Sequence, residues 1–265
     1  LVVSWFGNDL RCGSCKIRPM VERVGRDGVE IPWRAGGLNA NAVAAIPESE
    51  GRPVYGGTPA DDAVIEGIRA LRDAGKDVMF YPFILMNQLA GNGLPDPYGS
   101  AEQAALPWRG RITGSIAPGR TGTVDRTGQA DAEISMFFGA AQAGDFEVSK
   151  DGDRTLIKYS GPDEWSLRRF VLHYAHLCVA AGGVDSFCIA SELRGLTQLR
   201  GQNGFPGVVA LRKLAADVRK ILGPETAISY AADWSEYFGY APQDGSGDIY
   251  FHLDQLWADD NIDFV

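Results

Sequence analysis

The chain has 265 residues, of which 45% are hydrophobic and 22% charged, and its formal net charge is −9. This composition is typical of a globular protein, and the length is enough for one large α/β domain. The acidic balance disfavours a nucleic-acid surface, which needs a stripe of cations for the phosphates. Because no apolar run approaches the roughly 20 residues that span a bilayer, and no signal peptide is visible, we expect one domain over residues 1–265 without a membrane span.

Apolar runs that end in polar residues alternate with helical periodicity along the chain. The clearest run is Val184 to Ser191, which has glycines on both sides and ends at Glu192, and it predicts a strand buried on both faces. A Thr58 cap followed by proline predicts a helix that Gly75 ends. The other predicted strands are 1–6, 77–84, 227–232 and the beginning of one at 262–265; the other predicted helices are 131–143, 165–181 and 206–222, with a short one within 250–257 and a hairpin over 146–160 that turns at 151–153.

Alternation of buried strands with helices predicts parallel βα units, arranged as a barrel or as a doubly wound sheet. The sequence has no Gly-x-Gly-x-x-Gly after a strand and no Walker loop, which disfavours the nucleotide-binding sheets. An acid beside an aromatic recurs at predicted strand ends and favours a (β/α)8 barrel. Both chain ends have strand-like sequence, so we expect a barrel that is incomplete at both ends, with long loop insertions at 11–57 and 85–128.

Carboxylates and aromatic side chains at the predicted strand ends suit cleavage of a glycosidic bond. This reaction needs two carboxyl groups beside the scissile bond, and flat aromatic rings against which sugars pack. Each carboxylate has the alternative of capping a helix or binding loop amides. The three histidines and the lack of a Gly-x-Ser-x-Gly elbow disfavour acyl transfer. The candidates are Glu192 and Asp233 as catalytic groups, and Asp9, Glu236, Trp5, Tyr81, Trp234 and Tyr237 as substrate-binding groups.

The long loop at 85–128 also contains Trp108, Arg109 and other polar side chains, which suit a polyol or belong to a packed lid. Cys12 and Cys15 form one C-x-x-C without a second pair, which is weak support for zinc and leaves a loop disulfide open. His173 and His176 are three residues apart on a predicted helix. We expect their side chains to face solvent or a loop rather than to bind a metal. We therefore predict no metal and no cofactor.

Five stretches of the sequence resemble the TIM-barrel-like domain of gene transfer agents. That domain is a glycoside-hydrolase-like module in the tail-tip or host-specificity protein of these phage-like particles. The resemblance implies a particle protein made in the bacterial cytoplasm, a polysaccharide or peptidoglycan substrate, and other tail and baseplate proteins as partners. The stretches are 3–10, 51–61, 108–113, 173–178 and 230–237.

The resemblance also implies roles for single residues. It makes 1–6 the second barrel strand and 184–192 the fourth, which in retaining glycosidases of this clan ends in Asn-Glu with Glu as the acid/base. Here the pair is Ser191-Glu192, so Ser191 stands where an amide would hold a sugar hydroxyl. The resemblance places the nucleophile on a seventh strand outside this chain. A catalytically inactive barrel that binds glycan or supports the baseplate is the alternative.

Overall fold

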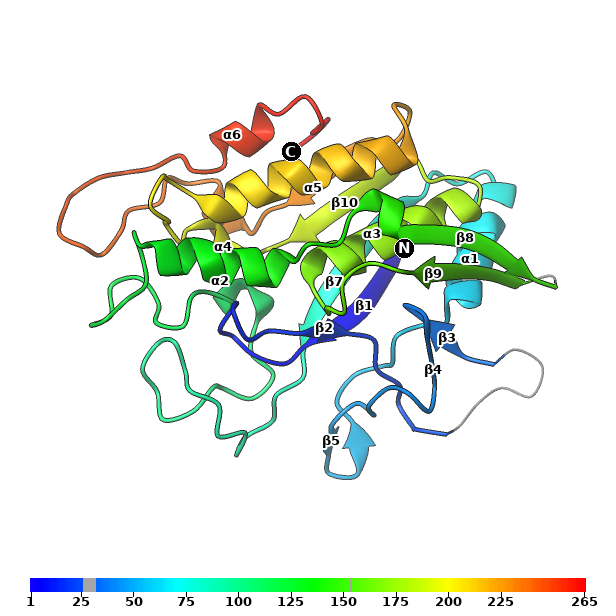
Figure 1. Ribbon diagram of the computed structural model, residues 1–265, viewed down its shortest axis with the longest axis horizontal. Helices are drawn as coiled ribbons and strands as arrows, with labels where there is room; N and C mark the ends of the chain where they lie inside the picture. Colours follow the sequence, from blue (N-terminus) through cyan, green and yellow to red (C-terminus); the bar gives the residue numbers. More distant parts are fainter. Residues whose placement is uncertain (26–31, 153) are drawn as a thin grey trace.

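A computed structural model describes residues 1–25, 32–152 and 154–265. Residues 26–31 of the predicted insertion, and Asp153 at the predicted hairpin turn, lie outside the described residues. Figure 1 shows a central sheet with helices lying across it and long loops at one end of its strands.

The central sheet has five strands in the order β11-β10-β7-β1-β2. Four of them are parallel and follow the chain order, whereas the short β2 pairs antiparallel with β1 at the edge. This arrangement confirms the predicted α/β class with parallel βα units. The strands are β1 (Val2–Gly7), β2 (Ile17–Arg18), β7 (Met79–Met86), β10 (Ser186–Ser191) and β11 (Ala227–Ala231).

The sheet is open within the described residues, although its strand order is that of a barrel. Consecutive parallel strands are neighbours from β1 through β11, and the chain end continues this order. Asp263 donates its backbone N–H to the carbonyl of Ile228 at 2.8 Å, and the Ser229 hydroxyl donates to the carbonyl of Phe264 at 2.6 Å. The predicted segment at 262–265 therefore lies beside β11, at the place of the next strand.

Among the described residues, three helices of 13 to 17 residues lie along the chain between consecutive parallel strands, and the middle one packs against the other two. The others are shorter or lie in the loops. The helices are α1 (Asp61–Asp73), α2 (Gly128–Phe138), α3 (Leu167–Ala180), α4 (Arg194–Thr197), α5 (Pro206–Leu222) and α6 (Asp254–Trp257), with 3-10 turns η1 (Arg109–Arg111), η2 (Ala143–Asp145) and η3 (Trp234–Glu236). The part of the chain that the structure describes also has three hairpins: β3 (Arg34–Ala35) with β4 (Leu38–Asn39), β5 (Glu48–Ser49) with β6 (Arg52–Pro53), and β8 (Phe146–Asp151) with β9 (Arg154–Tyr159).

Two helix starts differ from the prediction because of side-chain hydrogen bonds. Thr58 does not cap α1: its hydroxyl donates to the carbonyl of Ser4 and accepts the N–H of Met20, so the helix begins only at Asp61. In α2 the side chain of Thr127 accepts the N–H of Ala130, which starts the helix at Gly128 rather than at 131.

Trp5 belongs to the hydrophobic core, and its predicted role in substrate binding is wrong. Its side chain is 0% exposed and its ring packs 5.0 Å from that of Phe170 on α3. The indole N–H donates to the Tyr174 hydroxyl at 3.0 Å. Because alternate residues of a strand point to opposite faces, Trp5 faces the helices rather than the strand ends.

His173 is also buried, contrary to the expectation that it faces solvent or a loop. It is 2% exposed, and its Nε2 lies 3.0 Å from Oδ1 of Asp61 on α1. His176 is half-buried and its Nε2 lies 3.0 Å from the carbonyl oxygen of Ala143. Across the described residues, no cluster of three or more His, Cys, Asp or Glu side chains has metal-site geometry.

The cysteines of the C-x-x-C motif are free thiols. Cys12 and Cys15 are buried, and burial raises the pKa of both, to about 12 for Cys15. These thiols are core groups rather than nucleophiles.

In the described ranges, no helix combines the length and apolar character needed to cross a membrane.

Candidate active site

Glu192 is the first residue after β10, at the carboxyl end of the parallel strands. Its backbone N–H donates to the carbonyl of Ala231 on the neighbouring strand at 2.8 Å. Its φ is +51°, in the left-handed region that residues other than glycine rarely adopt. Such a conformation costs about 1–3 kcal/mol and is found preferentially at functional sites. The backbone therefore holds Glu192 in a strained position at the end of the sheet.

The Glu192 carboxylate is held on one oxygen by two consecutive residues of the long loop after β7. Trp108 donates its indole N–H to Oε2 at 2.6 Å, and Nη2 of Arg109 lies 3.0 Å from the same oxygen. Among the described residues, Oε1 accepts no hydrogen bond. The side chain remains 32% exposed, so a ligand can reach the carboxylate from solvent.

Arg109 connects the long loop after β7 to the end of β10. Its Nε donates to the carbonyl and the hydroxyl of Ser191 at 3.0 and 3.1 Å, and its guanidinium lies over the Phe83 ring at 3.7 Å. The side chain is 5% exposed, and this desolvation lowers the pKa of Arg109, an effect that the charge of Glu192 opposes. Tyr81 is half-buried beside Ser191, and desolvation raises the pKa of its hydroxyl. The structure thus brings Tyr81, Ser191 and Glu192 together.

Asp233 follows β11 and caps the short η3 turn. Its Oδ1 accepts the backbone N–H of Ser235 at 3.0 Å and also the Ser235 hydroxyl. In return, the Glu236 carboxylate accepts the N–H of Asp233 at 2.9 Å, which completes a capping box. Asp233 is partly exposed, and among the described residues its Oδ2 has no hydrogen-bond partner.

Glu236 is a buried structural carboxyl, so the predicted contact with substrate is wrong. It is 3% exposed and accepts hydrogen bonds from the hydroxyls of Thr197 at 2.8 Å and Tyr230 at 3.1 Å. Tyr230 in turn accepts the N–H of Leu193, next to Glu192. Burial raises the pKa of Glu236, and its hydrogen bonds oppose this rise only in part.

The raised pKa predicts a pH-dependent effect of Glu236→Gln. A carboxyl whose pKa is higher when folded stabilises the fold below its unfolded pKa and loses this contribution as pH rises through the folded pKa. The substitution should therefore lower the free energy of unfolding by less at pH 8 than at pH 4.5. Urea unfolding of both proteins at the two pH values measures this difference, and a constant difference would show that folding does not raise the pKa of Glu236.

Asp9 lies at the carboxyl end of β1, but its carboxylate is buried and bonded to neighbouring side chains. It is 3% exposed, forms an ion pair with Arg11 at 2.6 Å and accepts a hydrogen bond from Gln103 at 2.7 Å. Its predicted contact with substrate is wrong for the same reason as that of Glu236.

The predicted aromatic residues Trp234 and Tyr237 are 74% and 48% exposed, and they remain available to a ligand.

A cavity of about 540 Å³ lies among the loops that follow β7, β10 and β11. Trp108, which holds Glu192, forms part of its wall, and so does Ser235, which bonds to Asp233. We call it the rim cavity. Its size suits a small ligand. The lining residues are Tyr98, Trp108, Gly110, Arg111, Thr113, Pro118, Arg194, Gly195, Gln198, Ser235, Gly239, Tyr240, Ala241 and Gln243.

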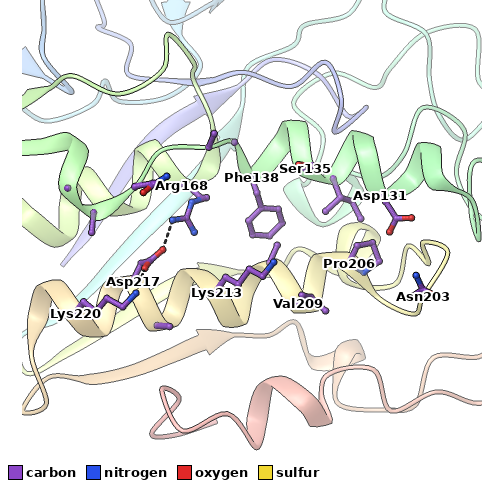
Figure 2. A pocket seen from close by; sticks show the side chains of 18 residues that line it. Asp131, Ser135, Phe138, Arg168, Asn203, Pro206, Val209, Lys213, Asp217 and Lys220 are labelled. Carbon is purple, nitrogen blue, oxygen red and sulfur yellow. Dashed lines mark hydrogen bonds and ion pairs between the residues drawn. The ribbon is translucent and has the colours of Figure 1, made fainter.

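A larger groove of about 880 Å³ lies between α2 and α5, on the outer helical layer. Figure 2 shows Phe138 between the two helices and the Arg168–Asp217 ion pair across the groove. None of the predicted site residues lines it. We therefore assign the candidate active site to the strand ends.

Sequence reasoning missed the roles of Trp108 and Arg109. It placed them in a polar loop suited to a sugar, but nothing local linked them to Glu192, which is 84 residues away from Trp108. The available signal was the consecutive aromatic and cation within a long loop after a buried strand, where functional side chains are common.

The second part of the chain is similar to a known protein family. Residues 165–265 match the model of the GTA TIM-barrel-like domain. The matched segment includes β10, β11, Glu192 and Asp233, whereas the resembling stretches before residue 165 lie outside the match.

Two solved structures of a GH113 β-1,4-mannanase, one of them a complex, are also similar. They are 14% and 13% identical in sequence, each with a TM-score of 0.41, and the alignments cover 89% of this chain. The chain spans only 44% and 45% of those structures. No curated protein matches the sequence.

Proposed function

We propose that this chain is a GTA TIM-barrel-like domain that hydrolyses glycosidic bonds, with Glu192 as the general acid/base. The observation that carries the proposal is Glu192 itself: strained, partly exposed, and held by Trp108 and Arg109 at the carboxyl ends of parallel strands. In barrels of parallel strands this end carries the catalytic groups. A carboxyl here can protonate the leaving oxygen and later activate water.

Asp233 is the second carboxylate of the proposal. It follows β11, which neighbours β10, and the bond from Glu192 N–H to Ala231 joins the two strand ends. Its unpartnered Oδ2 distinguishes it from Asp9 and Glu236, whose oxygens are engaged in buried hydrogen bonds. The exposed rings of Trp234 and Tyr237 supply apolar area against which sugar faces pack.

The biological setting that we propose is the tail tip of a phage-like particle. There the domain acts on host envelope or cell-wall polysaccharide during particle entry, beside other tail and baseplate proteins. The support is the match of residues 165–265 to the model of the GTA TIM-barrel-like domain, and the resemblance of the earlier stretches to the same domain.

A domain that binds glycan without cleaving it is the second candidate. It is favoured by Ser191, whose hydroxyl accepts a hydrogen bond from Arg109 rather than being free for a sugar. The ion pair with Arg109 also occupies one oxygen of the Glu192 carboxylate.

Incubation of the protein with cell-wall and envelope glycans in ¹⁸O-labelled water separates the two candidates. Hydrolysis places one ¹⁸O atom at each new reducing end, which mass spectrometry detects. Glycan retention on the protein without new reducing ends would support the binding domain and exclude the hydrolase.

A further inference from the structure

We propose that the rim cavity binds the carboxylate of an acidic sugar unit, so that the glycan that reaches Glu192 is anionic. This inference rests on the proposed function and names its substrate class. The shared chemistry is a sugar carboxylate, which a uronic acid or the lactyl group of muramic acid supplies.

The charge of the rim cavity is opposite to that of the protein. Arg111 and Arg194 line it, and both are exposed. Neither forms an ion pair with a described residue, and none of the described lining residues carries a carboxylate. In a chain of net charge −9, two unpaired guanidinium groups facing one cavity favour an anionic ligand. Guanidinium groups bind carboxylates with two parallel hydrogen bonds.

Arg111 is held in place by the wall of the cavity. Its guanidinium lies over the Tyr98 ring at 4.1 Å, and the Tyr98 hydroxyl donates to the backbone carbonyl of Arg111 at 3.0 Å. Gly195 allows this wall to pack closely, because a Cβ there would lie 2.7 Å from the carbonyl oxygen of Ile112. The preorganised cation therefore needs little ordering when it binds an anion.

A buried polar group in the same wall also lacks a partner. Thr113 is 0% exposed, and its Oγ1 makes no hydrogen bond with any described residue. Buried hydroxyls almost always have a hydrogen-bond partner, so the Thr113 hydroxyl is an exception in this wall. The amide side chains of Gln198 and Gln243 line the same cavity and can form hydrogen bonds with sugar hydroxyls.

The rim cavity adjoins the proposed catalytic group through Trp108. Trp108 lines the cavity, and its indole N–H donates to Glu192 at 2.6 Å. The acidic unit therefore occupies a position next to the bond that is cleaved. The groove between α2 and α5 is less suited to this role, because Asp217 pairs with both Arg168 and Lys220 there.

Calorimetric titration with matched oligosaccharides tests the inference. The probes are a galacturonic acid tetrasaccharide, its carboxyl-reduced counterpart, and a peptidoglycan glycan fragment that contains muramic acid. We expect at least one acidic probe to bind about tenfold or more tightly than the neutral one at low salt, since charge-assisted bonds are the stronger ones. The double variant Arg111→Gln/Arg194→Gln should remove this advantage, so that the acidic and neutral probes bind it about equally.

The double variant Arg52→Gln/Lys213→Gln removes the same number of charges outside the rim cavity and is the control. Equal losses in the two double variants, equal binding of acidic and neutral probes, or no binding of either acidic probe would overturn the inference. Which acidic probe binds distinguishes the uronic acid from muramic acid. Acid-selective binding without turnover would refute the hydrolase alone, whereas turnover without charge preference would refute this inference alone.

Discussion

The Glu192→Gln variant should release glycan about 10²–10⁴ times more slowly than the parent protein, the usual contribution of a general acid/base. This factor corresponds to about 3–5.5 kcal/mol in the activation free energy. Glutamine keeps the size of the side chain, and its carbonyl can still accept the Trp108 indole N–H, but it can neither give nor take the proton. Rates of reducing-end formation at saturating glycan measure the effect.

Glu225→Gln is the matched control, because Glu225 is exposed and lies before β11 rather than at the carboxyl ends of the strands. It should leave the rate unchanged. Thermal unfolding of both variants in parallel shows whether each is folded, which matters because Arg109 loses its carboxylate partner. A folded Glu192→Gln protein with the parent rate would remove Glu192 from the mechanism.

Replacing Trp5 by alanine should lower the free energy of unfolding by about 3–5 kcal/mol, the range for large aromatic side chains in cores. The indole is fully buried, contacts Trp165 and Phe170, and donates a hydrogen bond to Tyr174. Its removal leaves a cavity and an unpaired hydroxyl at the centre of the packing between β1 and α3. Urea unfolding monitored by circular dichroism measures the change.

Trp234→Ala is the comparison for Trp5→Ala, since Trp234 is 74% exposed and should change stability by less than about 0.5 kcal/mol. The two substitutions should therefore affect different properties: Trp5→Ala lowers stability, and Trp234→Ala weakens glycan binding. A stable Trp5→Ala protein that had lost only glycan binding would restore Trp5 as a sugar platform.

The fold was largely predictable because the signals for its strands are local. The apolar run before Glu192 and the runs at 77–84 and 227–232 predict buried strands, and alternation with helices predicts their parallel order. The same reasoning placed Glu192 at a strand end. Strand boundaries shifted by one or two residues, as expected where apolar and polar residues mix.

The details of the site depend on contacts between distant residues, which local patterns do not show. Trp108 and Arg109 reach Glu192 across more than 80 residues, and Asp61 meets His173 across 112. Trp5 was assigned to substrate binding because it lies near a strand end. That position does not show which face of the sheet the side chain occupies. A strand residue faces the helices or the opposite side according to its parity, and only the packed sheet decides which.

A crystal structure of the Glu192→Gln protein with a bound acidic oligosaccharide would locate the glycan relative to the proposed acid/base. We expect the side chain at position 192 to lie within hydrogen-bond distance of a glycosidic oxygen, with a sugar carboxylate on Arg111 or Arg194 in the rim cavity. An oligosaccharide seated in the groove between α2 and α5, or one whose glycosidic oxygens all lie away from position 192, would contradict this expectation.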